Sequence, residues 1–112
     1  MSNIIEEILR PCGITPDYAG FPPLVAAVER YLEDPDRIYS VEAELYAPAA
    51  ARCGCKTEHV ERNIRTILQH AWAENPDKLR QLARCELLTY PTVSAFIEDL
   101  ALAVKEALTP TH

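Results

Sequence analysis

The stretch PAAARCGCKTEHVERNIRTILQHAWA, residues 48–73, decides the fold because it contains two helical segments joined by a tight turn. Ala50 is small enough to let the first segment approach the second closely, and Gly54 makes the turn. Val60 and Ile64 then anchor the second segment against a core. This spacing is typical of a helix-turn-helix.

Residues 58–73 form the clearest helix in the chain. Thr57 is a residue type that caps helices, and a helix beginning at Glu58 gathers its apolar residues on one stripe. The stripe consists of Val60, Ile64, Ile67, Leu68, Ala71 and Trp72. The opposite face is polar and is therefore left for a partner.

Helical periodicity continues before this stretch, with no alternating run typical of a strand. Ser2 is expected to cap a short helix that ends before Pro11, and residues 11–23 form an ordered connector rich in proline and glycine. An amphipathic helix then runs from about Leu24 and stops at Asp34, the residue before a proline.

The next expected helix is capped by Ser40 and contains Pro48, which removes one backbone hydrogen bond. Either this helix kinks at the proline, or a first short helix ends and Pro48 opens a second one. The sequence leaves both alternatives open.

Two helices follow the decisive stretch. Asn75 supplies a cap and Pro76 the first helical position of one, and Thr92 or Ser94 starts the other. The sequence therefore predicts an all-α fold, a compact bundle of about six helices that contains the helix-turn-helix.

Composition restricts the class of protein. The 112 residues are 48% hydrophobic and 25% charged, which fits one packed domain and excludes a disordered or collagen-like chain. No apolar stretch approaches the roughly 20 residues needed to cross a bilayer. Because Glu6 and Glu7 stand where a signal peptide carries basic residues, we expect a cytoplasmic protein with no membrane partner.

The charge is unevenly distributed. The chain has a net charge of −6, which argues against generic affinity for nucleic acid. From Arg52 to Arg84, however, seven basic and four acidic residues give a net of +3, which leaves −9 for the remainder. A locally basic segment of an acidic protein can still face phosphates.

Cysteine and histidine do not form a recognisable site. The four cysteines match no secreted disulfide framework, so reduced thiols are expected. Cys53 and Cys55 precede His59, but zinc sites usually have two to four residues between paired cysteines, and we expect no metal. The histidines lack a nucleophile or carboxylate at a telling spacing, so we expect no enzyme, no cofactor and no small-molecule substrate.

The polar face of residues 58–73 carries groups suited to reading DNA. Arg62 can donate two hydrogen bonds to guanine, and Glu61 can accept one from cytosine. The same face also allows ion pairs between residues four apart, Glu58 with Arg62 and Glu61 with Arg65, that merely solubilise an exposed helix. The pattern alone leaves both interpretations open.

A family resemblance bears on this choice. Residues 60–65, Val-Glu-Arg-Asn-Ile-Arg, followed by Ala71-Trp72, resemble the recognition-helix stretch Val-Glu-Arg-Ala-Ile-Arg and its trailing Ala-Trp in the C-terminal effector domain of the stage zero sporulation protein A family. The similarity spans roughly residues 13–108. Flanking segments that agree in the same order are Gly13-Ile14-Thr15, Gly20-Phe21, Leu24, Ser40-Val41, Leu45-Tyr46-Ala47-Pro48, Pro91-Thr92, Ser94 and Phe96-Ile97.

The resemblance implies a bundle of six helices that binds double-stranded DNA through the second helix of the helix-turn-helix and pairs with a neighbouring copy on tandem sites. The implied activity is regulatory, not enzymatic. It implies an effector domain at residues 13–112, preceded by an N-terminal helical extension at 1–12 instead of the family's receiver domain. Carried over by position, it assigns the DNA-facing surface to Glu61, Arg62 and Arg65, with Glu58, His59 and Thr66 at adjoining positions.

Two hypotheses about function follow. The first is a bacterial, sequence-specific transcriptional regulator that reads the major groove with helix 58–73, as a possible homodimer. The alternative is a protein-interaction module that kept the bundle but lost DNA affinity, and that modulates a sporulation-type regulator or associates with itself. The alternative is motivated by the acidic balance and by His59, which stands where the family usually has an arginine.

Overall fold

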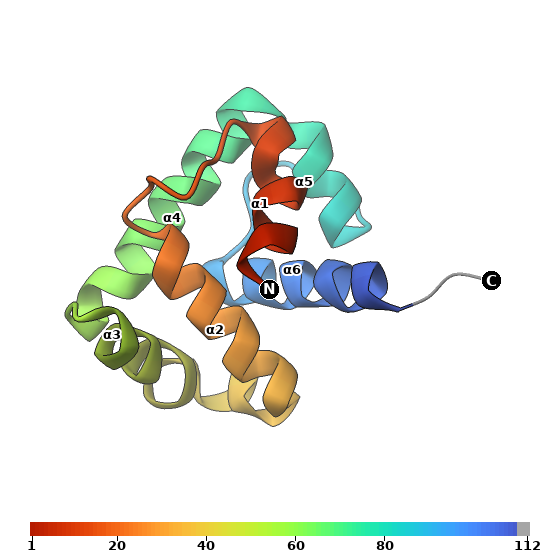
Figure 1. Ribbon diagram of the computed structural model, residues 1–112. Coiled ribbons are helices and arrows are strands. Elements are labelled where there is room, and N and C mark those ends of the chain that lie inside the picture. Colours follow the sequence, from red (N-terminus) through yellow and green to blue (C-terminus); the bar gives the residue numbers. More distant parts are fainter. Residues whose placement is uncertain (110–112) are drawn as a thin grey trace.

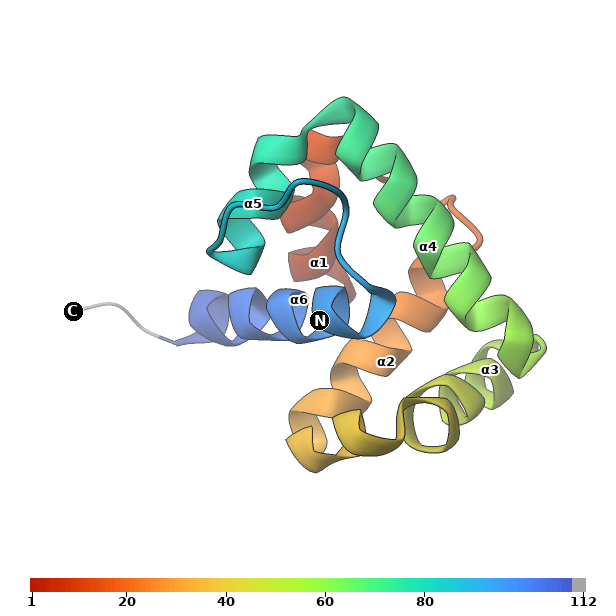
Figure 2. The ribbon, with the colours of Figure 1, turned by 180° about the vertical axis from the view of Figure 1, so that it is seen from behind.

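The computed structural model describes residues 1–109, and within this range it contains six α-helices and no strand (Figures 1 and 2). The predicted all-α bundle of about six helices is confirmed. The helices are α1 (Ser2–Leu9), α2 (Phe21–Glu33), α3 (Ala47–Cys53), α4 (Thr57–Glu74), α5 (Pro76–Ala83) and α6 (Val93–Leu108). Short 3₁₀ segments at Arg10–Cys12 and Pro35–Ser40 and a π-helical turn at Glu42–Tyr46 complete the secondary structure.

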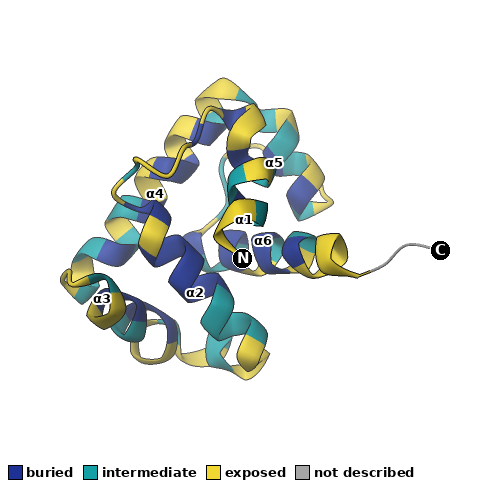
Figure 3. Cartoon of the chain, in the orientation of Figure 1, coloured by how far each residue is buried: buried dark blue, intermediate teal, exposed yellow. Residues whose placement is uncertain are grey.

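Helix α2 is the central element of the core. It contacts α3, α4 and α6, and its first two turns are buried almost completely (Figure 3). Helix α1 belongs to the same core, because Ile5 and Leu9 are fully buried and the helix packs against α6. The boundary between an N-terminal helical extension at residues 1–12 and an effector domain at 13–112 therefore stays a prediction.

Three predicted helix starts are wrong. Helix α2 begins at Phe21, because Pro22 and Pro23 fit the first turn, where no backbone N–H is needed. Ser2 and Thr57 are the first helical residues of α1 and α4, and neither helix has a side-chain cap. The predicted connector therefore ends before Phe21, and both polar residues lie inside the helices that they were expected to precede.

Three other predicted helix boundaries are confirmed. The side chain of Asn75 accepts a hydrogen bond from the Lys78 N–H at 3.2 Å, and this caps α5. Of the two candidates for α6, Thr92 is the cap, since its hydroxyl accepts from the Ala95 N–H at 3.2 Å. Gly54 ends α3 in the left-handed conformation, with φ +69°. The four cysteines are free, as expected.

The structure settles the question at Pro48. The chain does not form a helix capped by Ser40; a π-helical turn ends at Tyr46, and α3 begins with Pro48 in its first turn. Because proline has no N–H to donate, the carbonyl of Glu44 loses its helical partner. The Arg30 Nε donates to this carbonyl instead, at 2.7 Å, and so ties the turn to α2.

Candidate nucleic-acid interface

Helix α4 separates the core from an exposed polar face, as its periodicity predicts. The apolar stripe is buried without exposed area at Val60, Ile64, Ile67, Leu68 and Ala71. The helix runs along one side of the bundle, with α3 at its N-terminal end and α5 beyond its C-terminal end (Figures 1 and 2). Its polar side therefore forms an outer surface of the molecule.

The turn between α3 and α4 completes the helix-turn-helix. Ala50 is 2% exposed, and its carbonyl accepts a hydrogen bond from the Cys55 N–H at 3.0 Å. Helix α3 is in turn tied to α2 by an ion pair of 2.7 Å between Arg52 and Glu29. The relative placement of the two helices thus depends on a small residue, a glycine turn and one link to the central helix.

The middle of α4 is also held by the residue that precedes α2. A Cβ atom built on Gly20 would lie 2.4 Å from the carbonyl oxygen of Asn63 and 3.0 Å from the backbone nitrogen of Ile64. Only glycine allows two main chains to approach this closely. Gly20 was expected only through the family resemblance. A close approach between segments that are distant in the sequence produces no periodic pattern of residues.

The six predicted interface residues lie on the first three turns of α4. Glu58, Arg62, Arg65 and Thr66 are exposed, whereas His59 and Glu61 are half-buried on opposite flanks of the helix. All six are thus at the surface on one element. Whether they contact DNA stays a prediction.

The ion pairs on this face differ from the expected set. Arg65 pairs with Glu61, but Glu58 does not pair with Arg62; its carboxylate lies 4.0 Å from the His59 Nε2. The guanidinium of Arg62 has no ion pair or hydrogen-bond partner among residues 1–109. Of the two arginines, one has its charge matched within the helix and the other is free for an outside group.

Side chains from two other segments flank α4. On one side the ring of Tyr18 packs edge-on against His70, with 5.5 Å between the ring centroids. On the other side the amide of Gln69 donates to the hydroxyl of Tyr90 at 3.1 Å. The connector before α2 and the loop before α6 therefore border the polar face.

A groove of about 470 Å³ lies where the N-terminal parts of α4 and α6 meet. Three carboxylates line it, those of Glu42, Glu58 and Glu61. Within residues 1–109, the Glu61 carboxylate pairs with Arg65, and the Glu58 carboxylate has only the His59 imidazole at 4.0 Å. This edge of the polar face is consequently acidic and would repel phosphate groups.

Comparison with protein families gives one result. Residues 5–104 match the family described as Sporulation initiation factor Spo0A C terminal. The chain belongs to this family. The resemblance inferred from the recognition-helix stretch is therefore confirmed, and the Spo0A C-terminal family is one of helical DNA-binding domains, not of enzymes. A comparison with curated proteins found no match.

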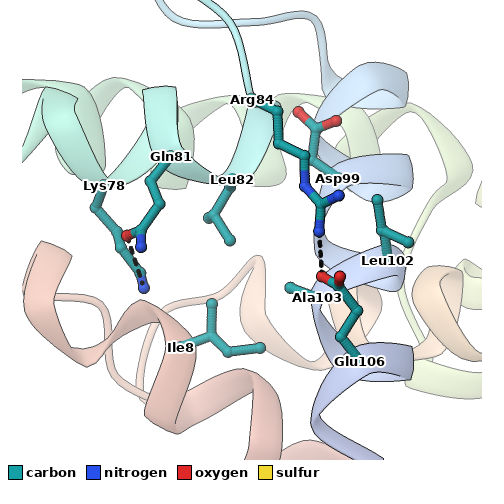
Figure 4. Close-up of a pocket in the computed structure, with 9 residues that line it drawn as sticks. All are labelled: Ile8, Lys78, Gln81, Leu82, Arg84, Asp99, Leu102, Ala103 and Glu106. Carbon is teal, nitrogen blue, oxygen red and sulfur yellow. Dashed lines mark hydrogen bonds and ion pairs between the residues drawn. The ribbon is translucent and has the colours of Figure 1, made fainter. Parts of the chain in front are cut away.

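The remaining features of this Spo0A-type domain lie away from the polar face. A cavity of about 360 Å³ is lined by residues of α1, α5 and α6 and by Arg84, which follows α5 (Figure 4). Arg84 reaches across to pair with Glu106, and Lys78 bonds to Gln81 at 3.4 Å. Burial, and to a smaller extent the neighbouring Glu98, raise the pKa of Asp99 in this cavity to about 6.

The described part of the chain has neither a membrane-spanning helix nor a group of metal-ligating side chains. No helix in residues 1–109 is long and apolar enough to span a membrane. Within the same residues, no three His, Cys, Asp or Glu side chains are grouped as metal ligands would be.

Proposed function

We propose that this Spo0A-type domain is a sequence-specific DNA-binding transcriptional regulator that reads the major groove of duplex DNA with the exposed face of α4. The observation that carries the proposal is Arg62, an unpaired cation in the middle of a polar helix face in a chain of a DNA-binding family. A guanidinium in such a place suits bidentate bonding to guanine O6 and N7. The cytoplasm of a bacterial cell is the corresponding location.

The other predicted residues take supporting roles in this proposal. Arg65 is paired with Glu61 in the free protein. It suits a contact with a DNA phosphate, which would replace the Glu61 carboxylate as its partner and would not depend on the base sequence. Glu61 is then released to accept from cytosine N4. Glu58 and His59 lie at the start of the helix, and Thr66 donates its hydroxyl to the Arg62 carbonyl at 3.1 Å, which leaves its methyl group for apolar contact.

Selection of duplexes from a random pool, followed by titration of the selected site, tests the proposal. We expect Arg62→Ala to cost about 1–3 kcal/mol on the selected site and to relax the preference at one base pair. Arg65→Ala should weaken binding to all sequences alike and lower the salt dependence. Arg10→Ala is a matched control, because it removes an exposed arginine of the 3₁₀ segment that follows α1, outside the polar face.

The proposal fails if the wild-type protein enriches no sequence at about physiological salt. It also fails if Arg10→Ala and Arg62→Ala weaken binding equally, since the effect would then be one of net charge alone.

The second candidate is an interaction module that modulates a sporulation-type regulator or associates with itself. It is favoured by the acidic edge formed by Glu42, Glu58 and Glu61 and by the net charge of −6. A protein that elutes from heparin at minimal salt and shifts no duplex would support this candidate over DNA recognition.

A further inference from the structure

An apolar groove of about 400 Å³ lies between the end of α2 and the second half of α6. Its apolar walls are formed by Tyr31, Leu32, Pro35, Ala101, Leu102 and Leu108. Two of these side chains are well exposed, Leu102 at 42% and Leu108 at 59%. Exposed leucines that line the same groove mark a surface that is stabilised when a partner covers it.

Aromatic side chains extend this surface beyond α6. Burial raises the pKa of the Tyr31 hydroxyl, and the charges of Glu98 and Tyr39 raise it further, because both groups lie near Tyr31. Tyr39 is 84% exposed. Exposed tyrosines at the edge of an apolar patch are typical of protein interfaces.

The charges on the rim indicate which partner fits. Glu98 and Lys105 both line the groove, have opposite charges, and take part in no ion pair within residues 1–109. They are two helical turns apart, about 10 Å along the axis, which is too far for them to pair with each other. Each therefore has an unmatched charge beside exposed apolar surface.

A second copy of this chain supplies both missing charges. If two α6 helices lie antiparallel about a two-fold axis near Leu102, Glu98 of one copy faces the partner's Lys105, and Lys105 faces the partner's Glu98. The leucine of each copy then packs at the centre. The pattern is self-complementary, as an isologous interface requires.

We propose that the α2–α6 groove is a homodimer interface with two-fold symmetry. Tandem DNA sites relate neighbouring copies by translation, so this contact differs from the pairing that the family resemblance implies. The second half of α6 projects away from α4 (Figures 1 and 2), so the dimer leaves both polar faces accessible. The proposal does not depend on DNA binding.

Sedimentation equilibrium on the full chain, from about 1 µM to about 1 mM, tests the interface. We expect a concentration-dependent dimer in the wild type. Glu98→Lys and Lys105→Glu should each weaken it about tenfold, because each variant places like charges opposite one another twice. An equimolar mixture of the two variants should restore the wild-type affinity, because their heterodimer has both ion pairs.

A second pair of variants tests the apolar contact. Leu102→Asp should reduce dimerisation at least about a hundredfold, whereas Leu88→Asp, at a leucine that is 95% exposed in the α5–α6 loop, should leave it unchanged. Circular dichroism checks that each variant is folded. Both leucines are exposed, so neither change opens a hole in the core.

Several results would overturn the proposal. A wild type that stays monomeric over the whole range rejects it, as does a dimer that survives Leu102→Asp or a charge-variant mixture that is no tighter than its components. If the monomeric Leu102→Asp variant still binds duplex DNA, dimerisation and DNA binding are independent. Rejection of the dimer would then leave the proposed role of α4 unaffected.

Discussion

At Gly20 the identity of one residue determines how closely α2 approaches α4. The backbone there has φ −81° and ψ −8°, which any residue can adopt, so glycine is not needed for conformation. It is needed because a methyl group would collide with the Asn63 carbonyl. The role of this glycine is therefore steric, unlike that of Gly54, which has a positive φ and open space around it.

We predict that Gly20→Ala lowers the free energy of unfolding by about 3 kcal/mol, because main chain must move to admit the new carbon. Gly54→Ala should cost only about 1–2 kcal/mol, the strain of a left-handed alanine. Urea denaturation of both variants measures the difference. If both variants lost the same unfolding free energy, the main chains of α2 and α4 could move apart at little cost.

At the scale of single elements, short polar residues between helices connect neighbouring segments. Asn75 is one example, since its side-chain oxygen caps α5 while its nitrogen donates to the Pro11 carbonyl at 3.2 Å. The same side chain thus starts one helix and holds the turn that follows α1. A substitution at this position can remove the hydrogen bond to Pro11 and keep the one that caps α5.

We predict that Asn75→Ala costs about 1–2 kcal/mol of unfolding free energy, since both bonds are lost. Asn75→Asp keeps the acceptor that caps the helix and loses only the donor to Pro11, so it should cost less than about 1 kcal/mol. Thermal and urea unfolding compare the variants. Equal losses would show that the cap contributes little.

The helices that local patterns specify were predictable. The stripe on α4, the cap at Asn75 and the left-handed stop at Gly54 follow from residue types at fixed spacing, whereas the sequence left Thr92 and Ser94 as equal candidates for the cap of α6. The sequence could not choose between alternatives at Pro48, because the donor that replaces the missing N–H comes from Arg30, in another helix. Features made by tertiary contact leave no local signal.

The candidate site likewise has features that the local sequence predicts and features that only tertiary contacts produce. The polar face of α4 is a local property and was predicted, but the sequence did not show that only one of its two possible ion pairs forms. Glu61 and Arg65 pair, whereas Glu58 lies near His59, so Arg62 is the one arginine of residues 1–109 without an ion pair. The flanking contacts of Tyr18 and Tyr90 depend on how the connector and the last loop fold back.

For the molecule as a whole, stability should depend on pH through Asp99. Its side chain lines the cavity between α1, α5 and α6, whose other charged residues are Lys78, Arg84 and Glu106, and Glu98 is its neighbour on α6. With a pKa raised to about 6 from an ordinary 3.8, the folded protein binds this proton more tightly than the unfolded chain. The ionised form therefore destabilises the fold above pH 6, and the penalty disappears as the pH falls toward about 3.

We predict that Asp99→Asn is more stable than the wild type at neutral pH, by about 1 kcal/mol after allowance for solvent screening. The advantage should shrink as the pH falls below 6 and vanish near about pH 3, where the wild-type carboxyl is protonated in both states. Denaturant titrations at a series of pH values measure it. If the difference in unfolding free energy between the two proteins stayed constant across this pH range, the raised pKa of Asp99 would be contradicted.

The contact between Gly20 and the main chain of α4 has a consequence for how the domain evolves. The pitch of this helix on the bundle is set mainly by backbone atoms and buried aliphatic groups. An outward position such as Arg62, whose side chain has no partner within residues 1–109, can therefore change without tilting the helix. A lineage that carries this glycine can alter the chemistry of such positions one substitution at a time while the angle of the helix is inherited unchanged.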